Sequence, residues 1–128
     1  MKAGDTFTFV DTAVDLHRHL WAIISDPLID VADPAIIVNF TTYNEGKDPT
    51  CILHVGDHPF IRHPTGVDYR NAIDVSNAGL EACANRGQVV LQEPLKPEIL
   101  HRIRQGAAES RFIPEGCRMV LVKQGLID

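Results

Sequence analysis

The chain has 128 residues, of which 45% are hydrophobic and 23% are charged, values typical of a single globular domain. It carries 12 Lys and Arg against 17 Asp and Glu, a net charge of −5, which argues against a broad basic surface for nucleic acid but leaves room for a narrow basic cleft. No apolar run approaches the ~20 residues that a membrane span needs, and the first residues have no apolar secretory core, so we expect a cytoplasmic protein without membrane contact.

Short strands are predicted for the first half of the chain. Residues 6–10 alternate polar and apolar side chains, as a half-buried strand does. Residues 20–24 and 35–40 are apolar runs with many β-branched side chains, which favours buried strands over helices. Two further strands are predicted at 50–54 and 69–75. Several short strands at close spacing indicate a small barrel or a strongly curled sheet.

Helices are predicted for the second half. Ser76 is placed to cap a helix that ends at Gly87, and a short extended link follows at 89–91. Pro97 suits the first turn of a second helix. Its apolar residues share one face at helical spacing: Ile99, Leu100, Ile103 and Ala107. Residues 117–123 could form either a strand or a helix, and we favour a helix.

These elements predict one α+β domain spanning residues 1–128. Residues 1–75 are expected to be mainly a β-barrel and residues 76–128 mainly helical. The sequence contains no repeat and no linker that would divide it further.

Three cysteines are widely separated and form no C-x-x-C pair: Cys51, Cys83 and Cys117. An odd number at this spacing fits neither a disulfide framework nor a zinc ribbon, so we expect buried free thiols. A nucleophilic Cys51 is an alternative, because His54 follows it closely.

Three of the six histidines lie in the segment 54–63, together with an aspartate and an arginine. Imidazole titrates nearest to neutral pH, so His54, Asp57, His58, Arg62 and His63 are candidates for proton transfer, substrate binding or metal ligation. Glycine and proline in the same segment indicate a loop rather than a helix. The alternative is that these are ordinary loop residues and that Asp57 caps a turn.

The front of the chain carries a series of features in a defined order: Gly4-Asp5 before the first strand, Arg18 ahead of Trp21-Ala-Ile-Ile-Ser25, and Ala35-Ile-Ile-Val-Asn-Phe40 followed by Thr41 and Thr42. In this order they resemble the PemK/MazF-like toxins of bacterial toxin–antitoxin pairs. The resemblance implies an SH3-like barrel, a homodimer, a partner antitoxin, and cleavage of single-stranded RNA without metal or cofactor.

Carried over residue by residue, the resemblance assigns the family arginine to Arg18 and the threonine at the strand end to Thr41. Metal-free RNA cleavage also needs a base and an acid, and His58 and His54 are the candidates for these roles. Further residues are expected to bind the substrate: His17, His19, Thr42, Asp57, Arg62 and His63. The chain departs from the family pattern at His19, where a proline is common, and in the segment 54–63, which matches no part of it.

Two other functions fit the same residues. The segment 54–63 can supply nitrogen and oxygen ligands to Zn²⁺ or Mn²⁺, which would make the protein a metal-dependent hydrolase. Alternatively, the barrel only binds a partner, such as an antitoxin segment laid along a sheet edge.

Overall fold

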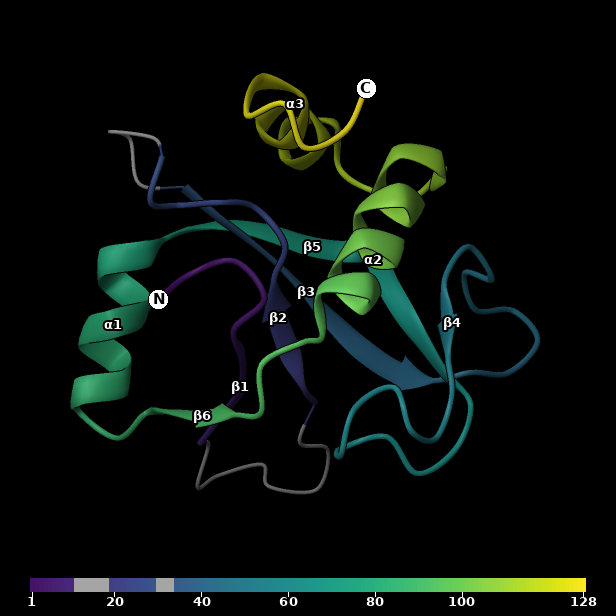
Figure 1. Ribbon diagram of the computed structural model, residues 1–128, viewed down its shortest axis with the longest axis horizontal. Helices are drawn as coiled ribbons and strands as arrows, with labels where there is room; N and C mark the ends of the chain where they lie inside the picture. Colours follow the sequence, from purple (N-terminus) through teal and green to yellow (C-terminus); the bar gives the residue numbers. More distant parts are fainter. Residues whose placement is uncertain (11–18, 30–33) are drawn as a thin grey trace.

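The computed structural model describes residues 1–10, 19–29 and 34–128, and it contains six strands and three helices in this part of the chain (Figure 1). The strands are β1 (Thr6–Phe9), β2 (Trp21–Ile23), β3 (Pro34–Thr42), β4 (Ile52–Leu53), β5 (Thr65–Ser76) and β6 (Val89–Gln92). The helices are α1 (Asn77–Asn85), α2 (Pro97–Glu109) and α3 (Glu115–Lys123).

All six strands form one antiparallel sheet in the order β4-β5-β3-β2-β1-β6. Within the described residues β4 and β6 are the two edges and do not pair with each other, so the expected closed barrel is wrong and the sheet is open. The edges are short, because β4 has 2 residues and β6 has 4. The predicted α+β class is confirmed.

The helices cover opposite faces of the sheet. Along β3, Ala35 and Ile37 join a core with Leu80 of α1, whereas Ile36 and Val38 join a core with α2 and α3. This alternation is the period of two that places neighbouring side chains of a strand on opposite faces. Figure 1 shows α1 on one side of the sheet and α2 and α3 on the other.

Most local predictions are confirmed. Ser76 caps α1 through a hydrogen bond from the Gly79 backbone amide to its side chain (3.1 Å), and Pro97 occupies the first turn of α2. The third helical segment is a helix, as favoured. The predicted link at 89–91 is instead strand β6, which pairs with β1. The strand predicted to begin at residue 69 begins at Thr65.

The pairing of β3 with β5 is interrupted by a wide irregularity. Ile37 lies opposite Ile73 and Asn39 lies opposite Asp68, so Val38 alone faces residues 69–72. Extra residues of this kind leave the ladder, bend the strand and re-aim its side chains. Two of these extra residues, Arg70 and Asn71, line the cavity described below.

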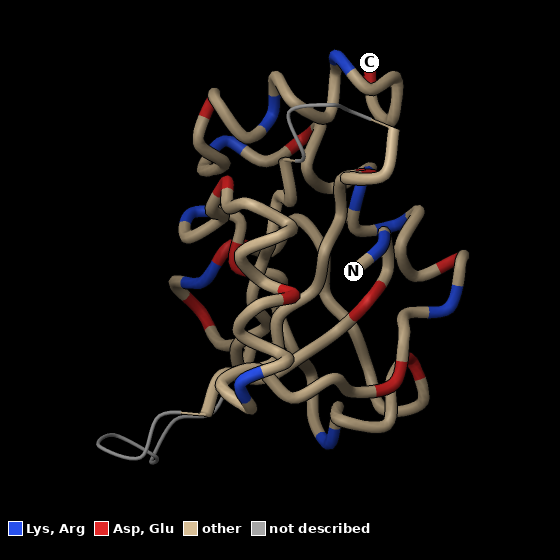
Figure 2. The backbone as a smooth tube through the Cα atoms, turned by 90° about the vertical axis from the view of Figure 1, so that its left-hand side faces the viewer, with Lys and Arg blue, Asp and Glu red and all other residues tan. Residues whose placement is uncertain are grey.

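Lys and Arg positions are interspersed with Asp and Glu over the described chain (Figure 2). None of the helices described is both long and apolar enough to cross a membrane.

Candidate functional site

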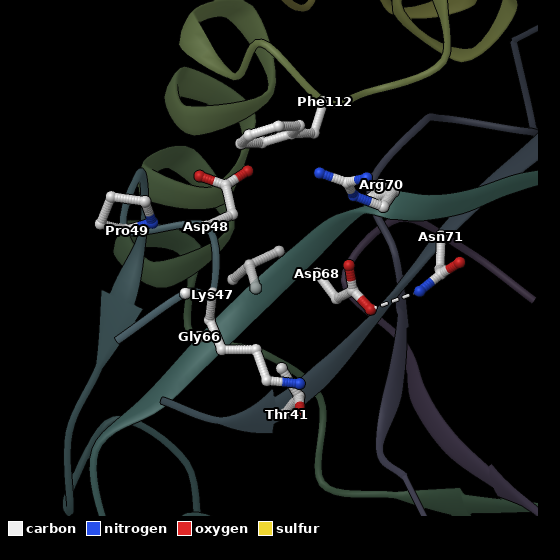
Figure 3. Close-up of a pocket in the computed structure, with 11 residues that line it drawn as sticks. Thr41, Lys47, Asp48, Pro49, Gly66, Asp68, Arg70, Asn71 and Phe112 are labelled. Carbon is white, nitrogen blue, oxygen red and sulfur yellow. Dashed lines mark hydrogen bonds between the residues drawn. The ribbon is translucent and has the colours of Figure 1, made fainter. Parts of the chain in front are cut away.

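A cavity of about 530 Å³, called the Thr41 cavity below, lies between the end of β3, the loop before β4 and the first half of β5 (Figure 3). Its volume is within the range of small-molecule sites, roughly 300–1,000 Å³. Polar and apolar groups share its walls. The polar and charged side chains are Thr41, Lys47, Asp48, Asp68, Arg70 and Asn71, and the apolar part includes Pro49, Val67 and Phe112, which comes from the connection between α2 and α3. A cavity with this lining is suited to a polar or anionic ligand that also carries a flat apolar group.

Two of the wall residues reach the cavity because of the irregularity in β5. Arg70 and Asn71 belong to the segment that lies opposite Val38 alone, and both are exposed. Their neighbour Tyr69 points the other way, into the core, where its hydroxyl donates a hydrogen bond to the Ile103 carbonyl (2.7 Å). The buried tyrosine thus anchors the strand while the next two residues turn toward the cavity.

A hydrogen-bond network holds the aromatic wall in place. Both carboxylate oxygens of Asp48 are used: Oδ1 accepts from the Thr50 amide (2.9 Å) and hydroxyl, and Oδ2 accepts from the Ser110 hydroxyl (2.8 Å). The Ser110 Oγ also accepts from the Phe112 amide (3.1 Å). The Arg70 guanidinium lies over the Phe112 ring at 4.4 Å from its centroid, within cation–π range.

The remaining charged groups are available to a ligand. Asp68 is half-buried, and its Oδ2 accepts from the Asn71 side-chain amide at 2.6 Å. The exposed Lys47 extends along the cavity toward Thr41 (Figure 3). No ion pair is formed by Lys47, Arg70 or Asp68 within the part of the chain that the structure describes. Two cations and one carboxylate therefore face the cavity without a charged partner among the described residues.

His19 lies just before β2, on the segment next to the end of β3, and it is not among the residues that line the cavity. Continuing the register of β2 and β3, in which Trp21 lies opposite Asn39, places His19 opposite Thr41. Its Nδ1 is 3.1 Å from the Phe40 carbonyl oxygen. A carbonyl oxygen only accepts, so Nδ1 carries the proton and the exposed ring has its lone pair on Nε2. This contact orients the ring, which is exposed to solvent.

The other predicted residues fall into different places. Arg18 and His17 lie outside the described residues. Thr41 is in the cavity wall, and Thr42 is exposed and paired with Thr65 at the same end of the sheet. His63 is exposed close by, with its Nδ1 3.3 Å from the Pro64 carbonyl oxygen.

The rest of the segment 54–63, the histidine loop, packs elsewhere, against the connection between β6 and α2. His58 is buried, and its Nε2 lies 2.5 Å from the Glu93 carbonyl oxygen while its Nδ1 accepts from the Phe60 amide (3.0 Å). Both ring nitrogens are therefore occupied, and the geometry favours a structural role over proton transfer for His58. None of the residues 54–63 lines the Thr41 cavity.

Asp57 acts as a turn cap. Its Oδ2 accepts from the His54 backbone amide (2.8 Å) and lies 3.5 Å from Nη1 of Arg102. The His54 side chain is exposed, and so is Arg62, which borders two further cavities of about 480 and 540 Å³ on this side of the molecule. No three metal-ligating side chains converge among the described residues, so the predicted ligand set of this loop is not assembled.

The nucleophilic alternative for Cys51 is not supported by its surroundings. Cys51 is a buried free thiol, and burial raises its pKa although the nearby Arg102 acts in the opposite direction. Burial also raises the pKa of the Cys117 thiol. A raised pKa keeps a thiol protonated and unreactive near neutral pH. The expectation of buried free thiols is confirmed for Cys51 and Cys117, whereas Cys83 is free but only half-buried.

Sequence reasoning missed most of the cavity wall. Lys47, Asp68, Arg70 and Asn71 are ordinary polar residues in the sequence, and Phe112 follows a helix without any local pattern. The predicted strand at 69–75 contained one sequence signal for the cavity wall. Arg70 and Asn71 are two polar residues in succession, where a strand with one buried face would alternate polar and apolar residues. Such a pair breaks the period of two and indicates a bulge.

The sequence matches no protein-family model, and no curated protein and no solved structure is significantly similar to it.

Proposed function

We propose that the protein is a metal-independent endoribonuclease of the PemK/MazF-like kind that binds single-stranded RNA in the Thr41 cavity. The observation that carries the proposal is the surroundings of Thr41. The strand register places His19 opposite Thr41, and Thr41 lines a cavity whose cations Lys47 and Arg70 form no ion pair with any described residue. Proton transfer and phosphate binding can therefore act on the same ligand.

The chemistry follows from these positions. Nε2 of His19 removes the proton from a ribose 2′-hydroxyl, and the resulting oxygen attacks the adjacent phosphorus. The bond from phosphorus to the 5′-oxygen breaks, which leaves a 2′,3′-cyclic phosphate and a 5′-hydroxyl end. Lys47 and Arg70 stabilise the negative charge on the phosphate oxygens, and the Thr41 hydroxyl donates a hydrogen bond to them. The leaving oxygen takes its proton from water, because His19 and Lys47 are both exposed to solvent.

The roles of three predicted residues change in this proposal. His19, expected only to bind substrate, becomes the base, and His58 and His54 are no longer the base and the acid. Arg18 lies outside the described residues and stays a proposed phosphate ligand on the resemblance to the family pattern. The homodimer and the antitoxin partner stay part of the proposal as well.

The relationship to the SH3-like barrel is also part of this proposal. We infer that the open sheet is a relative of that barrel in which the edges have separated. In support, Gly4 and Asp5 lie directly before β1, and Thr41 lies near the end of β3. Gly4 adopts a positive φ of 85° and its amide donates to the Ile23 carbonyl (2.8 Å), which joins the start of β1 to β2.

Cleavage of a single-stranded RNA in the presence of a chelator tests the function. Replacing His19 by Ala should lower the rate by about 10²- to 10⁴-fold, the usual contribution of a positioned proton-transfer group. His54→Ala is the matched control, because His54 is exposed and lies outside the cavity, and it should leave the rate within about twofold. The proposal fails if the unmodified protein does not cleave RNA with chelator present, or if both variants lose activity equally.

A second candidate is a partner-binding module without turnover. The observation in its favour is the edge strand β6, on which Val90 and Leu91 are 44% and 55% exposed. An exposed apolar edge is a template for an added strand from another chain. Binding of RNA or of a protein partner without cleavage would support this candidate over the nuclease.

A further inference from the structure

We propose that the Thr41 cavity selects a guanine base, with Asp68 as the residue that reads it. This inference rests on the proposed function, since it names the base that single-stranded RNA would place in the same cavity. It starts from the pair of side chains on the β5 wall, Asp68 and Asn71, whose carboxylate and amide are joined by a 2.6 Å hydrogen bond.

The carboxylate of Asp68 is oriented and not neutralised. The Asn71 amide donates only to Oδ2, and no Lys or Arg among the described residues is ion-paired with it. Asp68 is also half-buried, so the carboxylate presents a limited, defined set of acceptor positions to the cavity. The other carboxylate in the wall, Asp48, accepts three hydrogen bonds from Thr50 and Ser110 and does not compete for a ligand.

Guanine is the base that matches a free carboxylate. Its Watson–Crick edge carries two adjacent donors, N1–H and the N2 amino group, whereas a carboxylate carries two adjacent acceptors. Adenine and cytosine each place an acceptor beside their amino group, and uracil places a single donor between two acceptors. In all three cases at least one acceptor would face a carboxylate oxygen, and this contact is unfavourable.

The rest of the cavity fits a nucleotide in that orientation. Phe112 holds the planar guanidinium of Arg70 at the wall, and a base can stack on the open face of such a guanidinium. Lys47 extends toward Thr41 (Figure 3), so we assign the phosphate to the end of the cavity that these two residues share. The volume of about 530 Å³ accommodates one nucleotide.

The test measures the binding of each of the four ribonucleoside 5′-monophosphates to the whole chain, with NMR chemical shifts or calorimetry as the readout. GMP should bind roughly 10- to 100-fold more tightly than AMP, the usual discrimination of a bidentate base contact. Asp68→Asn should abolish this preference, because the amide replaces one acceptor by a donor. Asp74→Asn is the matched control on the same strand, since Asp74 is exposed and outside the cavity, and it should keep the preference.

Cleavage of two RNAs separates this inference from the nuclease proposal. The RNAs differ only in one G that is replaced by A within a uridine tract. Cleavage of both at equal rates would overturn the guanine site and leave the nuclease standing. Selective binding of GMP that depends on Asp68, without cleavage of either RNA, would support the guanine site and reject the nuclease. Equal loss of the preference in the Asp68 and Asp74 variants would overturn the guanine site.

Discussion

The imidazole of His58 joins three parts of the chain that are distant in sequence. The Glu93 carbonyl oxygen lies 2.5 Å from His58 Nε2 and also accepts from the Thr6 hydroxyl (2.6 Å), while the Phe60 amide donates to His58 Nδ1. The loop before β5, the start of β1 and the segment after β6 thus meet at one ring. A buried polar group with all its partners is a structural contact, and removing it leaves those partners unsatisfied.

Replacing His58 by Ala should therefore act on stability. We expect the free energy of unfolding to fall by about 2–4 kcal/mol, because the Glu93 carbonyl and the Phe60 amide lose a buried partner and a cavity is left. Urea unfolding followed by circular dichroism measures this change. His54→Ala is the control and should change stability by no more than about 0.5 kcal/mol, since its side chain is exposed. A His58 variant of unchanged stability that had lost RNA cleavage would instead assign His58 to catalysis.

Gly106 is a second residue whose role comes from a single contact. It lies within α2, and a Cβ atom added there would come within 2.9 Å of Tyr69 Cζ, even closer to the Tyr69 hydroxyl, and within 3.2 Å of Cys51 Cβ. The tyrosine is fully buried and bonded to the Ile103 carbonyl, so it has no free space to move into. The helix and β5 can pack this closely only without a side chain at position 106.

Gly106→Ala should lower the free energy of unfolding by about 2–4 kcal/mol through overpacking and loss of the Tyr69 hydrogen bond. The matched control is Gly116→Ala in α3, where the added Cβ meets nothing within 4 Å. That variant should gain up to about 1 kcal/mol from helix propensity alone. Thermal or urea unfolding of the two variants would contradict this account if both changed stability in the same direction.

Among the elements, α1 depends on a local signal at its first turn. Ser76 has an extended backbone (φ −72°, ψ 128°), and its hydroxyl oxygen accepts from the Gly79 amide. This satisfies one of the amides that a helix leaves without a partner at its start. Leu80 of the same helix fills the core on that face of the sheet together with Phe7 and Val89.

Ser76→Ala should reduce the free energy of unfolding by about 1 kcal/mol, since the alanine side chain cannot accept from the Gly79 amide. Ser76→Asp should keep the stability within about 0.5 kcal/mol, because a carboxylate can accept the same bond and interacts favourably with the helix dipole. Chemical denaturation of both variants checks the cap. Equal losses for Ala and Asp would show that the hydroxyl contact does not stabilise α1.

The β5 strand is the element that builds the site. Its first part pairs with both β3 and β4, and its second part pairs with β3 after the segment 69–72 has left the ladder. This arrangement directs Tyr69 into the core and exposes Arg70 and Asn71 to the cavity. One irregularity therefore separates a stabilising side chain from two ligand-facing ones within three residues.

For the whole molecule, three buried groups make stability depend on alkaline pH. Burial is the largest cause that raises the pKa of Tyr69 far above its ordinary value, and burial likewise raises the pKa of Cys51 and of Cys117. These groups stay protonated in the folded protein while the unfolded chain releases its protons. Their contribution is fully present below the unfolded pKa values and is lost as the pH rises above them.

The stability of the protein should therefore decline as pH rises above about 8.5, and more steeply above pH 10, where an unfolded tyrosine begins to ionise. The tyrosine contributes a slope of about 1.4 kcal/mol per pH unit in that range. Tyr69→Phe should be less stable at pH 8, because the hydrogen bond to Ile103 is lost, yet should show the shallower decline above pH 10. Urea midpoints at pH 8, 9.5 and 11 measure both effects, and parallel pH profiles would contradict the assignment to Tyr69.

Local predictions held wherever the physical cause is local. The strand at 35–40, the Ser76 cap and the apolar face of α2 follow from side chains within a few residues of one another. The closed barrel was wrong because closure requires the two edge strands to pair, and no pattern within a strand encodes its distant partner. The segment 54–63 was predicted to be a site because its residue types are local information. The buried hydrogen-bond partner of His58 at Glu93 is distant in the chain, so its structural role could not be predicted.

The sequence by itself determined where strands and helices form and which of their faces are apolar, because propensity, capping and periodicity act between near neighbours. Only the tertiary structure decided that Thr41 meets Lys47, Arg70 and Phe112 in one cavity. These four residues come from a strand end, a loop, a bulged strand and a helix connection. Their meeting depends on strand register and on the packing of α2 against the sheet, and both are set by contacts between residues far apart in the chain.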